Sequence, residues 1–177
     1  MNGKIRAFLL LIAANLFLSS CSAQMQPPDL PDISEIESFT KADHSLTFYN
    51  LDGEQKKLGD FKDSVVFLNI WATWCPPCLE EMPSIQRLYN KVSSTDIAFI
   101  LISPEKEEVI KNYLDKEGYT FDVYLLKDEL PKVFYSGQVP TTYLIDKKGN
   151  IVLTHIGYAI WDDESVVRFL EELSNNH

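Results

Sequence analysis

Long apolar runs separated by polar segments dominate the pattern of this chain. Residues 65–71 are apolar apart from one asparagine, which is typical of a buried strand, and residues 76–92 predict a helix directly after it. Residues 97–102 predict the next strand. A Ser-Pro pair at 103–104 favours a helix start, and Gly118 favours its end. The first half of the domain therefore alternates strand and helix.

The second half of the pattern predicts a strand at residues 121–126 and a short helical turn at 130–135. Residues 140–146 and 151–156 flank a Lys-Lys-Gly-Asn turn, which predicts an antiparallel pair. A final helix is predicted to begin at Asp162, which would cap it. Together these elements indicate an α/β domain with a mixed central sheet and helices on both faces.

The segment before the central strand predicts an N-terminal β-hairpin extension. Residues 45–50 and 55–58 would be its strands, and Asp52-Gly53 is a turn signal. We assign residues 39–177 to this domain. Residues 21–38 contain three prolines, at positions 27, 28 and 31, and predict an extended tether.

The first residues of the chain are typical of an export signal. Residues 1–20 carry two basic side chains and no acid, and the apolar run at 7–17 is short for a membrane-spanning helix. The signal ends in Leu-Ser-Ser before Cys21, which resembles the lipobox of bacterial lipoproteins. That resemblance implies a signal peptide at 1–20, lipid on Cys21 and a domain outside the cytoplasm, at the periplasmic face of a bacterial membrane. The alternative is an ordinary secretory signal cleaved near Ala23.

Composition narrows the classes of partner. The chain has 177 residues and a formal net charge of −10, which becomes −12 when the predicted signal is removed. This acidity argues against nucleic-acid binding and against a polybasic membrane contact. His44, His155 and His177 lack ligand spacing to the cysteines, which disfavours a metal site. The sequence implies no organic cofactor. We expect one domain and a monomer.

The motif Trp-Cys-Pro-Pro-Cys at 74–78 carries the chemistry. Cys75 and Cys78 stand where the central strand gives way to a helix. Backbone N–H groups at a helix N-terminus favour the thiolate, which is the form that attacks disulfides. If Cys21 carries lipid, these two cysteines must bond each other, a substrate or a metal. A closed zinc site needs about four ligands, which disfavours a metal.

These motifs resemble the thioredoxin fold, and residues 69–83 (NIWATWCPPCLEEMP) resemble its TlpA/ResA branch of membrane-tethered proteins. The resemblance covers roughly residues 39–173. It implies that Cys75 is the nucleophile and Cys78 the thiol that resolves the mixed disulfide. It also implies that Pro140 is cis. Trp74, Val139 and Pro140 would contact the substrate.

One position departs from thioredoxin. Asn69 stands where thioredoxin has a buried aspartate that moves the proton of the second thiol, and asparagine cannot ionise. The TlpA/ResA branch places a glutamate three residues after the second cysteine, which here is Glu81. We therefore expect Glu81, with a pKa raised by partial burial, to take the proton of Cys78. The alternative is a solvent-facing helix glutamate like its neighbour Glu80.

The resemblance implies a thiol–disulfide oxidoreductase that reduces protein disulfides and is recycled by a membrane electron donor. The branch includes reductants of apocytochrome c, so cytochrome c maturation is the expected setting. Three alternatives stay open: an oxidant that donates disulfides, a peroxide-reducing enzyme, and a copper-delivery or other binding module without catalysis. The close Cys-x-x-Cys spacing disfavours the peroxidase and the copper carrier.

Overall fold

The computed structural model describes residues 26–32, 34, 39–92 and 96–175. The predicted signal peptide and Cys21 lie outside these residues. The described strands are β1 (Thr40–Lys41), β2 (Thr47–Tyr49), β3 (Gln55–Lys57), β4 (Val65–Ile70), β5 (Ile97–Ser103), β6 (Val123–Leu125), β7 (Thr141–Ile145) and β8 (Asn150–Ile156).

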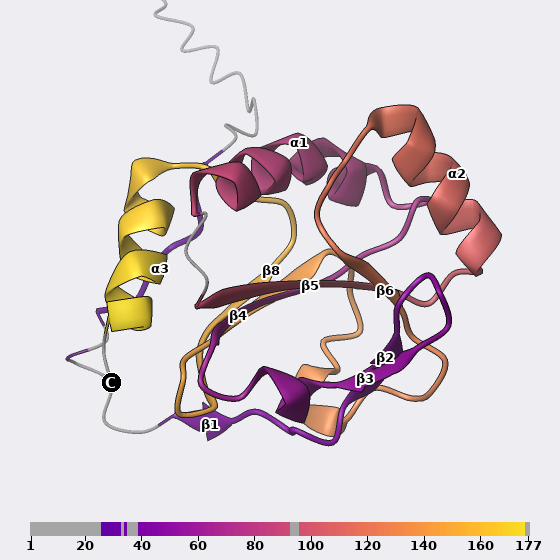
Figure 1. Cartoon of the computed structure of the whole chain (residues 1–177). Coiled ribbons are helices and arrows are strands. Elements are labelled where there is room, and N and C mark those ends of the chain that lie inside the picture. The colour runs from indigo at the N-terminus through magenta and orange to yellow at the C-terminus, as the bar shows by residue number, and fades with distance from the viewer. Residues whose placement is uncertain (1–25, 33, 35–38, 93–95, 176–177) are drawn as a thin grey trace, which may run out of the picture.

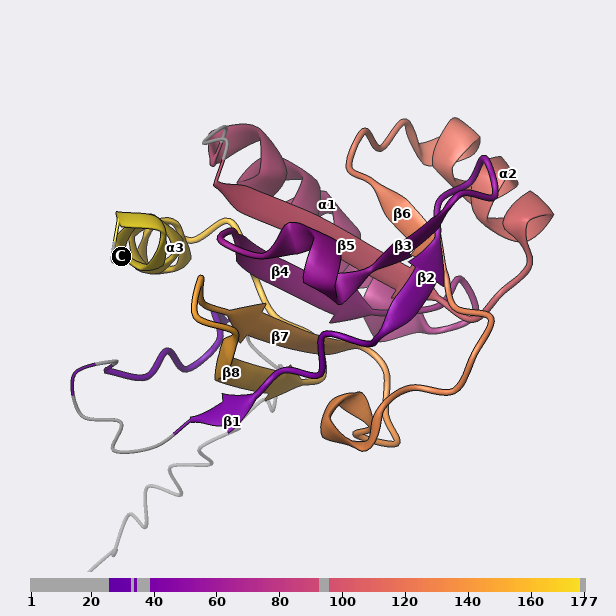
Figure 2. The same cartoon turned by 60° about the horizontal axis from the view of Figure 1, so that its bottom comes forward.

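The strands form one mixed sheet with β4 near its middle. Their order is β1-β8-β7-β4-β5-β6-β2-β3 (Figures 1 and 2). β4 runs parallel to β5 and antiparallel to β7, and β7 pairs antiparallel with β8 as predicted from the turn between them. All six β4 residues are buried, which explains why its sequence is apolar except at Asn69 instead of alternating.

The described α-helices, α1 (Pro76–Lys91), α2 (Glu107–Glu117) and α3 (Glu164–Asn175), pack on one face of the sheet (Figure 1). The other face is covered by the β2–β3 hairpin and by two 3-10 helices, η2 (Leu58–Phe61) and η3 (Lys132–Phe134). We expected helices on both faces of the sheet. On this second face, the described helices are only the two short 3-10 helices. The segments that cover it lack a long helical repeat. The hairpin is part of the sheet, because β2 pairs with β6.

Two predicted helix starts are wrong. Ser103 ends β5, and α2 begins four residues later at Glu107, since the Ser103 hydroxyl accepts a hydrogen bond from the Glu105 N–H and turns the chain there. The predicted end is correct, because Gly118 adopts the left-handed conformation (φ +74°) that closes the helix.

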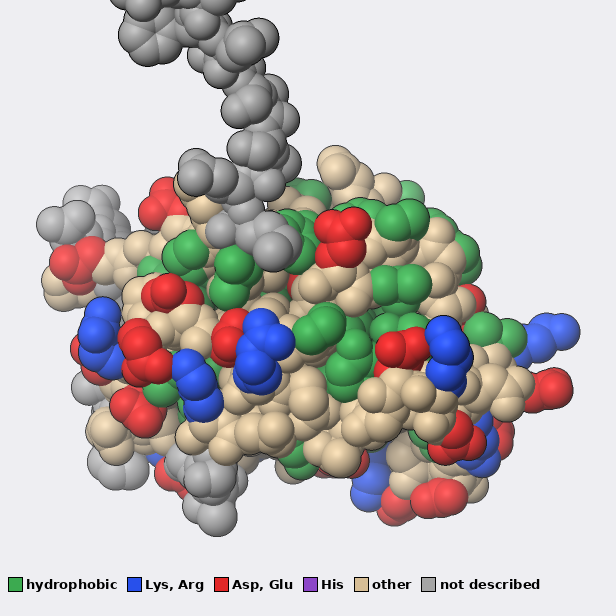
Figure 3. Space-filling model, turned by 90° about the horizontal axis from the view of Figure 1, so that it is seen from above, with side chains coloured by type: hydrophobic (Ala, Val, Ile, Leu, Met, Phe, Trp, Pro, Cys, Tyr) green, Lys and Arg blue, Asp and Glu red, His purple; other side chains and the backbone are tan. Residues whose placement is uncertain are grey.

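The final helix is capped by Asp163, one residue later than predicted. The Asp163 carboxylate accepts hydrogen bonds from the N–H and the hydroxyl of Ser165. Asp162 instead forms a two-point ion pair with Arg87 of α1. Figure 3 shows the face formed by the helices, where basic and acidic side chains lie side by side and do not form a patch of one sign.

Residues 26–32, part of the predicted tether, lie against the domain. The Ile160 N–H donates a hydrogen bond of 2.9 Å to the Gln26 carbonyl. Pro28 is buried, and Leu30 packs on the core shared with the helices. The chain is therefore held to the domain well before β1.

Phe67 of β4 offers a test of this core. Its ring is fully buried, with centroids 5.0 Å from those of Phe99 and Trp161. We expect Phe67→Ala to lower the free energy of unfolding by about 3–5 kcal/mol, because it removes the contacts and leaves a cavity. Denaturant titration of the oxidised protein measures this. Val109→Ala, at an exposed position on α2, should change the free energy by less than about 0.5 kcal/mol. Equal losses in the two variants would contradict the packing.

Candidate active site

Cys75 and Cys78 are joined by a disulfide at the start of α1. Cys75 is the N-cap residue, and its Sγ accepts a hydrogen bond of 3.3 Å from the Cys78 N–H. Cys78 is fully buried, whereas Cys75 retains 4% of its surface. In the reduced protein the same N–H and the helix dipole would stabilise a thiolate on Cys75. Cys75 is therefore the outer sulfur of the pair and Cys78 the inner one.

The loop before Cys75 is held by a carboxylate. Glu105 accepts a hydrogen bond of 2.6 Å from the Thr73 N–H and one of 2.7 Å from its hydroxyl. Ser103 also donates to Glu105. Glu105 precedes α2, and its carboxylate therefore lies against the active-site loop.

Trp74 and Val139 lie on either side of an open surface beside Cys75. Trp74 is 66% exposed. With Val139, Tyr135 and neighbouring residues it lines a hollow of about 280 Å³, which we call the first hollow. The peptide bond between Val139 and Pro140 is cis, as the resemblance implied. Among the described residues, no backbone hydrogen bond engages Val139.

The Val139 carbonyl also faces the disulfide. Its oxygen lies 3.5 Å from Cys75 Sγ. In the disulfide this sulfur carries no hydrogen, so the approach is a contact. In the thiol form the S–H would have an acceptor there.

Glu81 lies on α1 one turn after Cys78 and is fully buried, which contradicts the solvent-facing alternative. Its Oε1 accepts from Asn69 Nδ2 at 2.9 Å. Its Oε2 accepts from Trp161 Nε1 at 3.0 Å and from the Ala159 N–H at 3.4 Å. Three elements thus meet at one carboxyl group: α1, β4 and the loop after β8.

Burial raises the pKa of Glu81 from its ordinary value of 4.5 to about 7. The hydrogen bonds from Trp161, Asn69 and Ala159 lower the pKa and so oppose part of that rise. The balance leaves a carboxyl group that both holds and releases a proton near neutral pH. This is the property required of a general base or acid.

Asn69 can form a hydrogen bond with either the ionised or the protonated carboxyl group of Glu81. Its Nδ2 also donates to Thr142 Oγ1 at 2.9 Å, and its Oδ1 has no partner among the described residues. In the present orientation the amide donates to a carboxylate. A 180° turn would present Oδ1 to the protonated acid, and the two orientations differ only in the placement of N and O.

The structure therefore brings together the residues singled out from the sequence, with the exception of Cys21, which lies outside the described residues. The sequence analysis did not identify the roles of Ala159, Trp161 and Glu105. Trp161 lies 80 positions from Glu81 in the sequence, and no local motif predicts that contact. Among the described residues, no three His, Cys, Asp or Glu side chains are grouped to hold a metal ion.

A comparison with protein-family models matches residues 36–154 to the AhpC/TSA family. The chain belongs to the AhpC/TSA family. The match begins just before β1 and ends within β8, so it contains both cysteines, Glu81 and the Val139–Pro140 bond.

The names of curated relatives agree with the predicted branch. The chain is 36% identical over 110 residues to the thiol-disulfide oxidoreductase ResA of Bacillus thuringiensis (strain Al Hakam), covering 61% of this chain and 64% of that protein. It is 30% identical over 136 residues to ResA of Geobacillus kaustophilus, covering 76% of each. The match to the first relative thus spans somewhat less than two thirds of its length.

A solved structure supports the fold. The thiol:disulfide interchange protein of the thioredoxin family from Chlorobium tepidum has a TM-score of 0.64 and 25% identity, covering 79% of this chain and 99% of that one. The thioredoxin-like fold and the ResA-like branch predicted from the sequence are both confirmed.

The raised pKa of Glu81 predicts a pH-dependent stability. Below about pH 4.5 the carboxyl group is protonated in both the folded and the unfolded chain. As the pH rises toward 7, only the unfolded chain loses the proton, so the folded state is destabilised by up to about 3 kcal/mol. We expect the stability of the wild type relative to Glu81→Gln to fall over this window and to be constant above it.

Denaturant titrations from pH 4 to 8 measure this difference. Glu80→Gln is the matched control, because Glu80 is exposed beside Glu81 on the same helix. A wild-type-minus-Glu81→Gln difference that does not vary with pH would show that Glu81 titrates normally.

Proposed function

We propose that this protein is an extracytoplasmic thiol–disulfide oxidoreductase that reduces disulfides in other proteins. The observation that carries the proposal is the Cys75–Cys78 disulfide at the N-terminus of α1, with the outer sulfur as the helix cap. The names of the relatives and of the solved neighbour support the same chemistry.

The reaction takes two steps. The Cys75 thiolate attacks a substrate disulfide, which forms a mixed disulfide and releases the first substrate sulfur as a thiolate. Cys78 then loses its proton and attacks Cys75 Sγ, which releases the second substrate sulfur. The substrate gains two electrons and two protons, and the protein is left with the disulfide that the structure contains. A membrane donor that carries a dithiol would return the two electrons.

Glu81 would act as the base in the second step. It lies one turn after Cys78 on the buried face of α1, and a pKa of about 7 lets its carboxylate accept the Cys78 proton at neutral pH. The proton would pass to solvent as the site opens on product release.

Trp74, Val139 and Pro140 would bind the substrate backbone beside the sulfurs. Because the backbone of Val139 has no partner in the sheet, an extended peptide could pair with its N–H and carbonyl. The exposed Trp74 ring would cover one side of that peptide.

We place the protein outside the cytoplasm on the basis of the export signal at residues 1–20 and propose that Cys21 carries lipid. No helix in the described part of the chain is long and apolar enough to cross a membrane. Reduction of apocytochrome c, as in the branch that this chain resembles, is the proposed setting. It requires the haem-binding cysteines to be kept as thiols.

The reduction potential of the Cys75–Cys78 pair tests the direction of transfer. We expect equilibration in glutathione and dithiothreitol buffers to give a potential more negative than that of glutathione, because a reductant must hold its electrons less tightly than its substrate. Cys75→Ser, which cannot form the bond, is the control. A more oxidising value would indicate disulfide donation instead. Absence of any reversible couple would leave a binding module.

The role of Glu81 predicts a selective kinetic defect. In Glu81→Gln we expect the second step, attack by Cys78 on the mixed disulfide, to slow on the order of 100-fold at pH 7, because the base is missing. Stopped-flow measurement of both steps against pH separates them, and Glu80→Gln again provides the matched control. Unchanged thiol pKa values together with unchanged turnover would remove Glu81 from the mechanism.

A further inference from the structure

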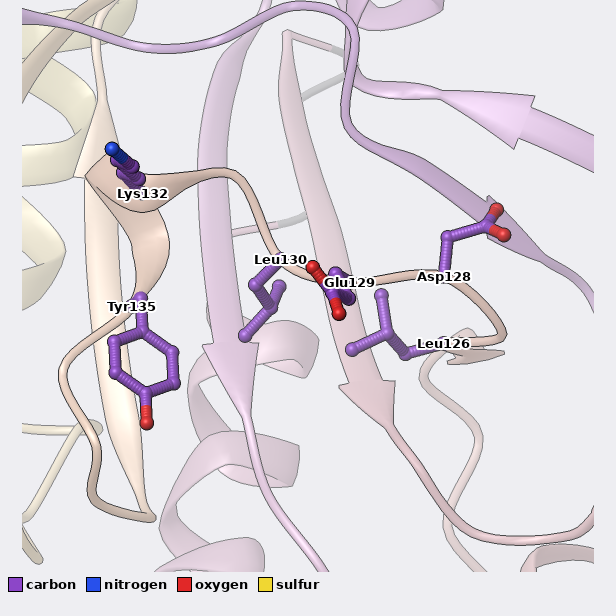
Figure 4. Close-up of a pocket in the computed structure, with 6 residues that line it drawn as sticks. All are labelled: Leu126, Asp128, Glu129, Leu130, Lys132 and Tyr135. Carbon is purple, nitrogen blue, oxygen red and sulfur yellow. The ribbon is translucent and has the colours of Figure 1, made fainter.

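A second hollow opens next to the first, on the segment that joins β6 to β7. Its volume is about 530 Å³. Figure 4 shows Leu126 and Leu130 on either side of Glu129, with Tyr135 toward one end and Asp128 toward the other. The residues that line it are Leu126, Asp128, Glu129, Leu130, Lys132 and Tyr135.

The two hollows adjoin. Leu126, Leu130 and Tyr135 line both of them, so apolar side chains extend from the surface at Trp74 and Val139 to the β6–β7 segment. A chain bound beside Cys75 and directed this way would pass from the first hollow directly into the second. The second hollow is therefore an extension of the candidate active site.

Exposed aromatic rings mark this surface. Tyr135 is 73% exposed and Trp74 is 66% exposed, more than the other large apolar side chains exposed in the described part of the chain, Val109 and Ile156. Apolar surface that gathers along a groove instead of being scattered is typical of a site that a partner covers. Tyrosine and tryptophan are also the residues that contribute most to such contacts.

The charges at the rim define the partner further. Asp128 and Glu129 carry two negative charges against the one positive charge of Lys132. Lys127, the neighbouring base, lies over the Tyr49 ring at 4.0 Å from its centroid. The rim is thus net acidic, which favours a basic side chain in the occupant.

We propose that the second hollow binds the substrate polypeptide beyond its reacting cysteine, and that it selects segments with apolar side chains followed by a lysine or arginine. An extended segment paired with Val139 would direct alternate side chains toward the apolar side chains that line both hollows. The basic residue would then meet Asp128 and Glu129. This inference rests on the proposed function, since it assigns a substrate class to the same site.

Two peptides test the selection. Each peptide carries one cysteine in a mixed disulfide with glutathione. In the first peptide, leucines and then a lysine follow the cysteine in both directions along the chain. In the second, serines and then a glutamate take these positions. We expect the reduced protein to react with the leucine–lysine peptide about 10-fold faster at limiting concentration, because only that peptide fills the hollow. The second-order rate constants are measured by stopped flow.

Variants at the rim should alter the ratio of the two rate constants. Tyr135→Ala should lower it about fivefold or more, and Glu129→Lys should lower it by a few-fold, with a smaller effect in 1 M salt. Both side chains are exposed, so the fold should tolerate these changes. Val109→Ser on α2 and Glu171→Lys on α3 are the matched controls. Neither residue lines the first or the second hollow, so the ratio should stay at its wild-type value.

Binding of the same peptides with serine in place of cysteine separates this proposal from the redox function. The wild type could reduce no disulfide and still bind the leucine–lysine peptide through Tyr135 and Glu129. That result would contradict the proposed redox function but support peptide binding in the second hollow. Equal rate constants and equal binding for both peptides would overturn the groove. A concentration-dependent dimer abolished by Tyr135→Ala would also overturn it, because the hollow would then be a contact between two copies.

Discussion

The burial of one carboxyl group constrains much of this structure. A carboxylate removed from water is costly unless hydrogen bonds replace the lost hydration, and Glu81 obtains them from Asn69, Trp161 and Ala159. The donors come from β4 and from the loop after β8, so the active-site helix cannot shift without breaking them. Ser84 adds a further tie, because its hydroxyl accepts from the Trp161 N–H and donates to the Glu81 carbonyl.

The rigid and the open parts of the site are cleanly divided. The sulfurs, Glu81 and the loop at Thr73 are held by hydrogen bonds from several elements. In the sequence, Trp74 lies between Thr73 and Cys75, which are both held by hydrogen bonds, yet the Trp74 ring is largely exposed to solvent. Such a division suits a catalyst that must fix its own reacting atoms while accepting polypeptides of different sequence.

The features that could be predicted are those that depend on short stretches of sequence. Strand β4, helix α1 and the Cys75–Cys78 pair are each specified by apolar runs or motifs within about 10 residues. Glu81 was found through family resemblance, and its helical spacing from Cys78 is local. Its partner Trp161 was missed, because a contact across 80 positions depends on how the whole sheet closes.

The wrong helix starts have a similar cause. By residue type, Asp162 and Asp163 are both suitable N-caps. Arg87 of α1 forms an ion pair with Asp162, and Asp163 caps the helix instead. Ser103 was given to a helix because a serine before a proline is a good local start. The strand β5 extends through it, because its backbone pairs with Leu125 of β6. Tertiary pairing thus overrode a local preference in both places.

The hydrogen bond between Gln26 and Ile160 would limit the distance between the domain and a membrane that held the chain at Cys21. If Cys21 carries lipid, four residues lie between the anchor and Gln26, where the chain meets the domain, and these five Cα–Cα steps reach at most roughly 18 Å. A tether that ran free to residue 38 would allow more than three times that reach. With lipid on Cys21, the shorter tether would keep the domain close to the bilayer and restrict its rotation. Partners embedded in or resting on the same membrane would therefore meet it at a high local concentration, whereas those farther away would not.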